Sequence, residues 1–389
     1  VLDSVARRLE AAIADLPGSI ASRFGGDEFF VLLKNVHSVE TGMAKAEEII
    51  ALLRQPHDLD GQRLVVNATI GLAFWDATQF SPETLMRNAD LAMNRAKHAG
   101  KDGIVVFAPD MAAEIDERRR LEAELKNAIE RGEFEPYYQP QVEMTTRRIK
   151  GVEALVRWTH PERGILAPGS FISVAESSGL IVDIGRAVLE KACRDAAAFP
   201  EPISVSVNLS TVQLVRADVP TLVRECLDRS GLPAHRLTLE ITESVMMRDE
   251  VRCREIIRRL RGMGVAVALD DFGTGYSSLS YLRGFGFDEL KIDRSFVSDV
   301  GENRESIGIV QTIVALGRHL GLRVVAEGIE TEKQAILLMS IGCNTGQGYL
   351  YSRPMPAEAI SAMLRSPVER TGETAPRFSP HILLGGLSA

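Results

Sequence analysis

The chain has 389 residues, with 45% hydrophobic and 25% charged side chains and a formal net charge of −8. This length suits two or three domains of an ordinary globular protein, and every apolar run is shorter than the roughly 20 residues of a membrane-spanning helix. The acidic balance argues against a long nucleic-acid groove, so we expect no DNA or RNA partner, although local basic residues could still hold nucleotides.

The first stretch of the chain has the pattern of an amphipathic helix. Apolar residues recur at helical spacing over 2–13, and the chain starts inside this pattern at Val1, without Met. We therefore expect a fragment of a longer protein, with any sensor or membrane region upstream. Four cysteines without CxxC spacing predict reduced, mostly buried thiols and a cytoplasmic location. They are Cys193, Cys226, Cys253 and Cys343.

Residues 1–110 are expected to form one α/β domain. Its most distinctive feature is a predicted hairpin, in which strands at 22–24 and 29–33 are joined by a turn containing Gly25 and Gly26. Adjacent glycines allow the positive φ angles that a tight hairpin turn requires. Two further strands and a helix are predicted at 64–74, 103–107 and 82–99.

Residues 111–131 are very polar, with a run of mixed charges at 116–120. This pattern predicts a solvated connector helix held by i,i+4 pairs. Residues 132–367 then alternate short apolar segments with helical stretches, which predicts a parallel sheet and an α/β fold, a (β/α)₈ TIM-like barrel. Residues 368–389 are rich in Pro, Gly, Ser and Thr and predict a loose tail.

Six oxygen-bearing side chains stand where predicted strands of this second region end, after 149–152, 203–207, 237–239, 265–269 and 323–326. In a barrel of this kind the strand ends open on one face, so these side chains are expected to converge. Carboxylates gathered so closely need a cation, and an oxygen-only set suits Mg²⁺ or Mn²⁺. The alternative is that each is a helix N-cap or first-turn residue. They are Glu153, Asn208, Glu240, Asp270, Asp271 and Glu327.

Two short motifs carry a resemblance to a known family. Gly25-Gly26-Asp27-Glu28-Phe29 is a verbatim GGDEF motif, and Glu153-Ala154-Leu155 is a verbatim EAL motif. An EAL tripeptide alone is unspecific, but further family segments accompany it in order. They are Tyr138-Gln139-Pro140, Asn208-Leu209-Ser210, Leu239-Glu240-Ile241-Thr242-Glu243, Asp270-Asp271-Phe272-Gly273, Lys291-Ile292-Asp293, Ala326-Glu327-Gly328 and Gln347-Gly348-Tyr349. The chain therefore resembles a tandem GGDEF–EAL protein of bacterial cyclic di-GMP signalling, with a nucleotidyl-cyclase-like domain before the barrel.

The resemblance implies hydrolysis of cyclic di-GMP to linear pGpG by two metal ions, Mg²⁺ or Mn²⁺. Two such cations clamp the attacking and leaving oxygens and lower the pKa of a bound water. By likeness to the family, one metal is held by Glu153, Asn208, Glu240 and Asp270. Asp270 bridges to the second metal, which Asp271 and Glu327 complete.

Other catalytic and substrate contacts are also implied by likeness. Lys291 resembles the family lysine near the nucleophilic water, and its apolar neighbours mark it as a strand residue rather than a surface lysine. Asp293, expected on the same strand face, resembles an acid that supports this lysine and the substrate site. Gln139 and Gln347 resemble ligand-contacting glutamines, although Gln139 alone is equally well read as a strand-end polar residue. Arg157 resembles an arginine that binds phosphate with paired donors.

Glu243 resembles the residue that anchors the loop at 271–279, which in the family supports the second metal and dimerisation. We therefore expect a homodimer through the EAL domain. In the GGDEF half, Lys97 and Lys101 match basic positions that meet GTP phosphates. The metal-binding and guanine-recognising segment of a GGDEF domain would lie upstream of Val1, so we expect no diguanylate cyclase activity from this chain and at most weak regulatory GTP binding.

Two other functions fit the same sequence. One is a receptor that binds cyclic di-GMP without cutting it, although such relatives usually lack several of the metal carboxylates that are all present here. The other is a regulatory EAL half within a bifunctional diguanylate cyclase/phosphodiesterase. Without the family match, the barrel would still suggest an Mg²⁺-dependent phosphoesterase of unknown substrate.

Overall fold

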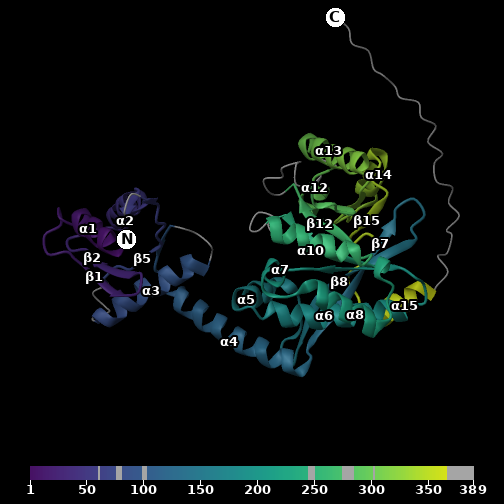
Figure 1. Cartoon of the computed structure of the whole chain (residues 1–389), viewed down its shortest axis with the longest axis horizontal. Helices are drawn as coiled ribbons and strands as arrows, with labels where there is room; N and C mark the ends of the chain where they lie inside the picture. Colours follow the sequence, from purple (N-terminus) through teal and green to yellow (C-terminus); the bar gives the residue numbers. More distant parts are fainter. Residues whose placement is uncertain are drawn as a thin grey trace, which may run out of the picture. The chain divides into compact units, whose positions relative to one another are not determined.

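The chain divides into two compact units, the first ending at Leu125 and the second beginning at Lys126 (Figure 1). Helix α4 (Asp110–Arg131) covers the stretch in which the connector helix is expected, and the division falls inside it. The predicted tail at 368–389 lies outside the residues that the structure describes. The computed structural model describes residues 1–59, 62–75, 81–98, 103–243, 250–273, 284–300 and 303–365.

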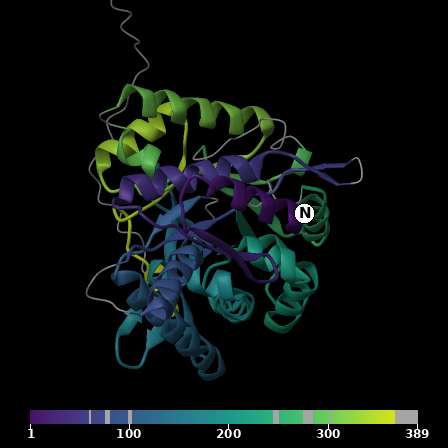
Figure 2. The same cartoon turned by 90° about the vertical axis from the view of Figure 1, so that its left-hand side faces the viewer.

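The first unit packs helices against short sheets. A small apolar core lies where α1 and α2, which run side by side in Figure 2, meet through Val5, Leu9, Ile49 and Leu53. The helices of this unit are α1 (Leu2–Ala12), α2 (Val39–Arg54) and α3 (Pro82–His98). Its described strands pair as β1 (Ile20–Gly25) with β2 (Glu28–Leu32), β3 (His57–Leu59) with β4 (Gln62–Leu64), and β5 (Ile70–Leu72) with β6 (Ile104–Val106).

The predicted hairpin is confirmed, because β1 and β2 pair antiparallel and Gly26 takes a φ of 53° in the turn. The single strand predicted at 64–74 is wrong. In this range only Leu64, the last residue of β4, and Ile70–Leu72 of β5 are strand, and β4 pairs antiparallel with β3 whereas β5 pairs parallel with β6. Helix α2 was not predicted, although Ser38 caps its start by accepting from the Thr41 amide.

The second unit is built on a closed barrel of eight described strands, which confirms the TIM-like architecture. The strand order runs from β10 through β11, β12, β13, β14, β15 and β7 to β8, and β8 pairs with β10 to close the ring, while β9 (Gly164–Leu166) extends β8 outside it. The ring consists of β7 (Phe134–Glu143), β8 (Ile149–His160), β10 (Ser204–Asn208), β11 (Leu237–Thr242), β12 (Ala266–Phe272), β13 (Glu289–Ile292), β14 (Arg323–Ala326) and β15 (Thr345–Gln347).

The barrel departs from an all-parallel ring at β7, which runs antiparallel to both β8 and β15. The reason lies in the connection, because β7 and β8 are joined by a short turn over 144–148 and not by a crossover helix. The Arg147 backbone in this turn has a φ of 57°. The sequence prediction of a purely parallel sheet is therefore wrong for this strand.

Amphipathic helices surround the barrel and pack their apolar sides onto it (Figure 1). Helix α6, for example, buries Ile184, Val188 and Ala192. In the part of the chain that the structure describes, no helix combines the length and the apolar character needed to cross a bilayer. The described helices are α5 (Ile172–Ser178), α6 (Ile181–Ala198), α7 (Thr211–Arg216), α8 (Val219–Ser230), α10 (Glu250–Gly262), α12 (Arg294–Ser298), α13 (Arg304–Leu320), α14 (Glu332–Ile341) and α15 (Ala357–Arg365).

An aromatic cluster anchors the outer end of the β7–β8 pair. Trp158 is 1% exposed and its ring lies 5.7 Å from that of Phe134 and 5.8 Å from that of Phe171. Its indole Nε1–H donates to Glu133 Oε2 at 3.0 Å, and the Thr159 amide donates to the Glu133 carbonyl. Trp158 therefore links Glu133, which lies between α4 and β7, to β8, the strand that carries Glu153.

We expect Trp158→Ala to lower the free energy of unfolding of the barrel by about 3–5 kcal/mol, since it removes a large buried ring and leaves a cavity. Urea denaturation followed by far-UV circular dichroism measures this loss. Trp158→Phe keeps most of the ring but loses the indole donor, so its loss should be smaller. An alanine variant with the midpoint of the unaltered protein would contradict this account.

Candidate active site

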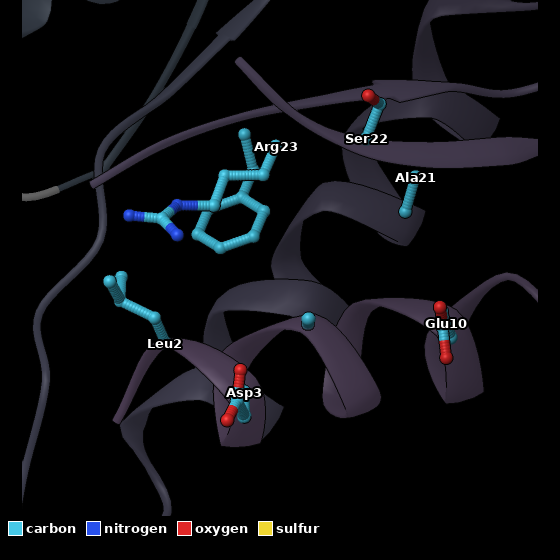
Figure 3. Close-up of a pocket in the computed structure, with 8 residues that line it drawn as sticks. Leu2, Asp3, Glu10, Ala21, Ser22 and Arg23 are labelled. Carbon is cyan, nitrogen blue, oxygen red and sulfur yellow. The ribbon is translucent and has the colours of Figure 1, made fainter. Parts of the chain in front are cut away.

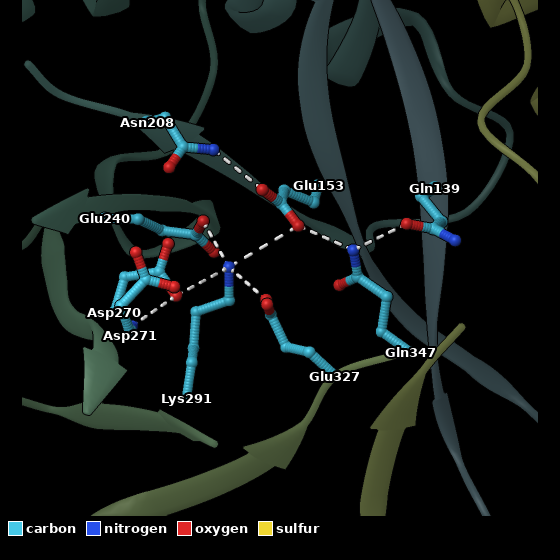
Figure 4. A network of polar contacts seen from close by, with 9 residues as sticks. All are labelled: Gln139, Glu153, Asn208, Glu240, Asp270, Asp271, Lys291, Glu327 and Gln347. Carbon is cyan, nitrogen blue, oxygen red and sulfur yellow. Dashed lines mark hydrogen bonds and ion pairs between the residues drawn. The ribbon is translucent and has the colours of Figure 1, made fainter. Parts of the chain in front are cut away.

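A buried lysine lies at the centre of the candidate site. Lys291 is 1% exposed on β13, and its Nζ lies 2.6 Å from Glu240 Oε2 and 2.5 Å from Glu327 Oε1. The same Nζ is 3.4 Å from Glu153 Oε2 and 3.5 Å from Asp270 Oδ1 (Figure 4). These carboxylates come from β8, β11, β12 and the residue after β14. The fold thus brings four separate segments onto one ammonium group.

Amide side chains hold Glu153 from both sides. Asn208 Nδ2 donates to Glu153 Oε1 at 2.7 Å, and Gln347 Nε2 donates to Glu153 Oε2 at 2.5 Å (Figure 4). Gln347 Nε2 also lies 3.0 Å from Gln139 Oε1, and Gln139 Nε2 donates to the Ser352 carbonyl. Glu153, predicted as a metal ligand, is therefore linked by hydrogen bonds to Gln347 and Gln139, predicted to contact substrate. The sequence alone did not indicate this link.

The predicted strand ends need correction. Asn208 is the last residue of β10 and Glu327 follows β14, as expected, but Glu153 and Glu240 lie within β8 and β11. These strands run on because their neighbours continue to pair, with Glu153 opposite Gln139 and Glu240 opposite Asn208. Polar side chains can continue the inward face of these strands because the Lys291 ammonium compensates their charge.

The adjacent acids Asp270 and Asp271 depend on a local irregularity of β12. Successive side chains of a regular strand point to opposite faces. Here the register with β13 shifts between Leu269 and Phe272, and Asp271 has a φ of 55°. The Asp271 amide donates to Asp270 Oδ1 at 2.9 Å. Such a bulge redirects side chains beside an active site, and both acids lie on one side of Lys291 in Figure 4.

Burial and mutual repulsion raise the pKa of several acids in the network. The pKa of Glu327 is raised to about 8, chiefly by burial, with Lys291 opposing and Glu153 adding repulsion. Burial and the neighbouring Asp270 raise the pKa of Asp271 to about 6. Burial and the charge of Glu153 likewise raise the pKa of Glu240 well above its ordinary value. These groups therefore retain protons at a higher pH than free acids.

The pKa shifts of Glu153 and Lys291, in contrast, favour the charged form of each side chain. Burial disfavours the charged form of Glu153, but Lys291 and the amides of Gln347 and Asn208 outweigh it and lower the pKa of Glu153. Burial also disfavours the charged ammonium, yet the surrounding carboxylates raise the pKa of Lys291 well above its ordinary value. Glu153 and Lys291 are therefore a charged pair, and Glu240 and Glu327 beside them have raised pKa values.

The donor set fits a hard divalent cation. It consists of carboxylate oxygens and one amide, and Glu240 Oε1 is buried without a hydrogen-bond partner among the described residues. Four carboxylates contact a single ammonium and Asp271 adjoins one of them, so negative charge is in excess unless protons or cations balance it. Within the described ranges, no group of three or more acidic, histidine or cysteine side chains has the arrangement of a metal site. The carboxylates of the network are instead arranged around Lys291 Nζ.

The other predicted site residues lie around this network. Arg157 Nη1 donates to the Val156 carbonyl, and its guanidinium lies 5.8 Å from the ring centre of Tyr137. Asp293 is not a strand residue as predicted, because β13 ends at Ile292 and Asp293 caps α12, accepting from the Ser295 amide at 3.0 Å. It still lies beside the network, because its charge and a side-chain hydrogen bond act on Asp271 and help to raise the pKa of that acid.

Glu243 is 9% exposed and directly follows β11. Of the 271–279 loop that it is predicted to anchor, the part from 274 onward lies outside the described residues.

In the first unit, the predicted phosphate-binding Lys97 lies 3.6 Å from Glu28 of the GGDEF motif, and both side chains are about half exposed. Lys101 lies outside the described residues. A hollow of about 170 Å³ opens between α1 and the hairpin, lined in part by Asp3, Ser22 and Arg23 (Figure 3). Neither Lys97 nor Glu28 lines this hollow, so the Lys97–Glu28 pair and the hollow are separate features.

Comparison with known proteins gives matches to both halves. Residues 122–354 match the EAL domain family, and residues 1–103 match the diguanylate cyclase, GGDEF domain family. Among curated relatives from Pseudomonas aeruginosa, the bifunctional diguanylate cyclase/cyclic di-GMP phosphodiesterase MucR is 40% identical over 93% of this chain and 53% of its own length. The cyclic di-GMP phosphodiesterase NbdA is 36% identical over 94% of this chain and 47% of its own length.

A solved structure of the PaMucR phosphodiesterase in complex with c-di-GMP is also similar. It is 45% identical, has a TM-score of 0.60, and the match covers 62% of this chain and 99% of that one. The chain spans about half the length of the curated relatives it matches. It belongs to the EAL domain family and carries GGDEF domain sequence ahead of its EAL domain.

Proposed function

We propose that this chain hydrolyses cyclic di-GMP to linear pGpG with the help of two Mg²⁺ or Mn²⁺ ions. The observation that carries the proposal is the set of four buried or partly buried carboxylates gathered around Lys291 at one end of a barrel. The names of MucR and NbdA describe cyclic di-GMP phosphodiesterases, and the PaMucR structure holds the same dinucleotide. These likenesses support the substrate, and the donor chemistry supports the metals.

The residues that would hold the metals are those whose oxygen atoms already lie together. Glu153, Asn208, Glu240 and Asp270 would hold one cation. Asp270 would also contribute to holding the second, together with Asp271 and Glu327. When bound, the cations would stabilise the charge that develops on the phosphate and lower the pKa of the attacking water.

Lys291 has a distinct task in this mechanism. Its ammonium now neutralises the same carboxylates that divalent cations would neutralise. With those charges balanced by cations, the three N–H donors of Lys291 would be available to the attacking water or to a phosphate oxygen. Arg157 offers paired donors for a second phosphate oxygen, and Gln347 keeps Glu153 in place.

We expect Glu153→Ala to lower kcat for cyclic di-GMP by at least about 10³-fold while the fold survives, because it removes a metal ligand and the charged partner of Lys291. Separation of nucleotide products over time by chromatography, with circular dichroism for the fold, measures both effects. Glu143→Ala is a matched control, since this acid ends β7 and contacts Thr146 and Lys150 instead of the network.

Two outcomes would count against the proposal. Unchanged turnover in Glu153→Ala would refute the site assignment. Tight binding of cyclic di-GMP by the unaltered protein, without any pGpG in the presence of Mg²⁺ or Mn²⁺, would favour the receptor function instead.

Metal binding should stabilise the protein more strongly near pH 8 than near pH 6. The folded-state pKa of Glu327 is raised to about 8, so its proton stabilises the metal-free fold at low pH, and this contribution is lost as the pH rises through that pKa. A cation must displace such protons, so binding strengthens with pH. Thermal unfolding with and without Mg²⁺ should show a shift at least about twice as large near pH 8.

The difference between the two melting temperatures at each pH removes the contribution of all other titrating groups. Glu153→Ala should show little Mg²⁺-dependent shift at either pH. Equal shifts of the unaltered protein at the two pH values would contradict the proton-linked site.

A further inference from the structure

The inward face of the barrel stays polar beyond the candidate active site. Residues at alternate positions of a strand share one face, so Gln141 of β7 and Gly151 of β8 lie on the face that carries Gln139 and Glu153. Gln141 is 5% exposed, although branched apolar side chains usually fill the interior of such a barrel. A buried amide in this place is costly unless it forms hydrogen bonds.

Gln347 presents a buried acceptor towards this region. The residue is 4% exposed, and its Nε2 lies between two oxygen acceptors, Glu153 Oε2 and Gln139 Oε1. Only an amide nitrogen can donate to both, so the orientation of this amide is fixed. Its carbonyl oxygen Oε1 is directed away from both acceptors in Figure 4. This oxygen is buried and accepts no hydrogen bond from the residues that the structure describes.

Gln141 supplies the complementary group, a buried donor. Its Nε2 has no hydrogen-bond partner within the described part of the chain. Gln141 and Gln347 are directly opposite each other in the antiparallel pair of β7 and β15. Side chains of directly opposite residues lie on the same face of a sheet, with Cβ atoms roughly 4.5–5.5 Å apart. An unpaired donor and an unpaired acceptor are therefore neighbours inside the barrel.

The opposite end of the Gln141 amide lies against Gly151. A Cβ atom at Gly151 would come within 3.1 Å of Gln141 Oε1 and 2.4 Å of Ser204 Oγ, so the glycine leaves room for this contact. Since Oε1 occupies the space beside β8, Nε2 lies on the side of the amide away from Gly151. Strand β15, which carries Gln347, borders β7 on the edge opposite to β8.

We propose that Gln141 is a positioning residue that holds Gln347 through one ordered water, which accepts from Gln141 Nε2 and donates to Gln347 Oε1. The inference rests on the proposed function and extends the hydrogen bonds behind Glu153 by one residue. A buried water makes about three hydrogen bonds to groups that would otherwise be unsatisfied, and these two atoms are such groups. With the water bound, Gln347 cannot turn its amide away from Glu153 without losing a further hydrogen bond.

A double-mutant cycle in the full chain tests this role. Methionine has nearly the length and volume of glutamine but no N–H donor. We expect Gln141→Met to lower kcat/KM for cyclic di-GMP by about 3- to 10-fold, the equivalent of one net hydrogen bond. Gln347→Met removes the contact to Glu153 and should lower kcat/KM by about 10- to 100-fold. In the Gln347→Met background, adding Gln141→Met should change kcat/KM by less than about twofold, because the residue through which Gln141 acts is gone.

Two kinetic outcomes would overturn the inference. One is equal losses from Gln141→Met in the two backgrounds, because an effect on packing alone does not depend on Gln347. The other is an unchanged kcat/KM in Gln141→Met. Urea denaturation adds a check on the hydrogen bond itself, since replacing an unpaired buried amide by an apolar group of the same shape is neutral or stabilising. Gln141→Met should instead lower the free energy of unfolding, and a higher value would contradict the bridge.

A crystal structure of the unaltered protein separates this inference from the proposed catalysis. An ordered water within about 3.2 Å of both Gln141 Nε2 and Gln347 Oε1 would support the bridge, and we expect it to be absent from Gln141→Met. Clear density for both side chains without such a water would refute it. If the unaltered protein does not hydrolyse cyclic di-GMP in Mg²⁺ or Mn²⁺, the proposed function fails, while the crystal structure and the unfolding measurement still decide the bridge.

Discussion

The contact between the Lys291 ammonium and four carboxylates is the interaction on which the second unit depends. A charge that is 1% exposed is costly unless it is paired, and so are the acids around it. The carboxylates come from strands that are distant in sequence, so they meet only when the barrel is closed. The network is consequently a weak source of stability, since its Coulomb energy mainly offsets desolvation. It acts as a constraint on geometry, because any displaced strand leaves a buried charge unpaired.

The same constraint explains the irregular backbone at Asp270 and Asp271. A regular strand would direct one of these acids inward and the other outward, whereas the bulge and the positive φ of Asp271 place both beside the network. Such a backbone costs on the order of 1–3 kcal/mol and persists only where the surroundings fix it. Here a well-paired strand on one side, with Thr242 opposite Asp270, supplies that support. The strain is thus located where two adjacent carboxylates must serve one site.

The sequence predicts some residues of this site and misses others, because some positions follow from the strand–helix pattern and others from tertiary contacts. The convergence of Glu153, Glu240 and Glu327 follows from strand–helix alternation, because parallel strands open at one face of the barrel. The sequence places Lys291 in a strand but does not predict that its side chain is buried. The burial of a side chain depends on neighbours that the local sequence does not specify. The capping role of Asp293 was missed because it depends on where β13 ends, and boundaries are the least certain part of a sequence prediction.

Strand β7, whose antiparallel direction the sequence did not predict, lengthens the strand face that carries the site. A parallel neighbour would be connected through a helix, whereas the hairpin lets β8 pair with β7 without interruption from Gly151 to Trp158. Arg157 lies four residues beyond Glu153 on the same face, which at roughly 3.3 Å per residue places it about 13 Å further out. The strand pair thus carries one face from the metal-type donors to a guanidinium group. A hairpin in place of one βα unit therefore extends a compact acidic centre along one strand face to the Arg157 guanidinium.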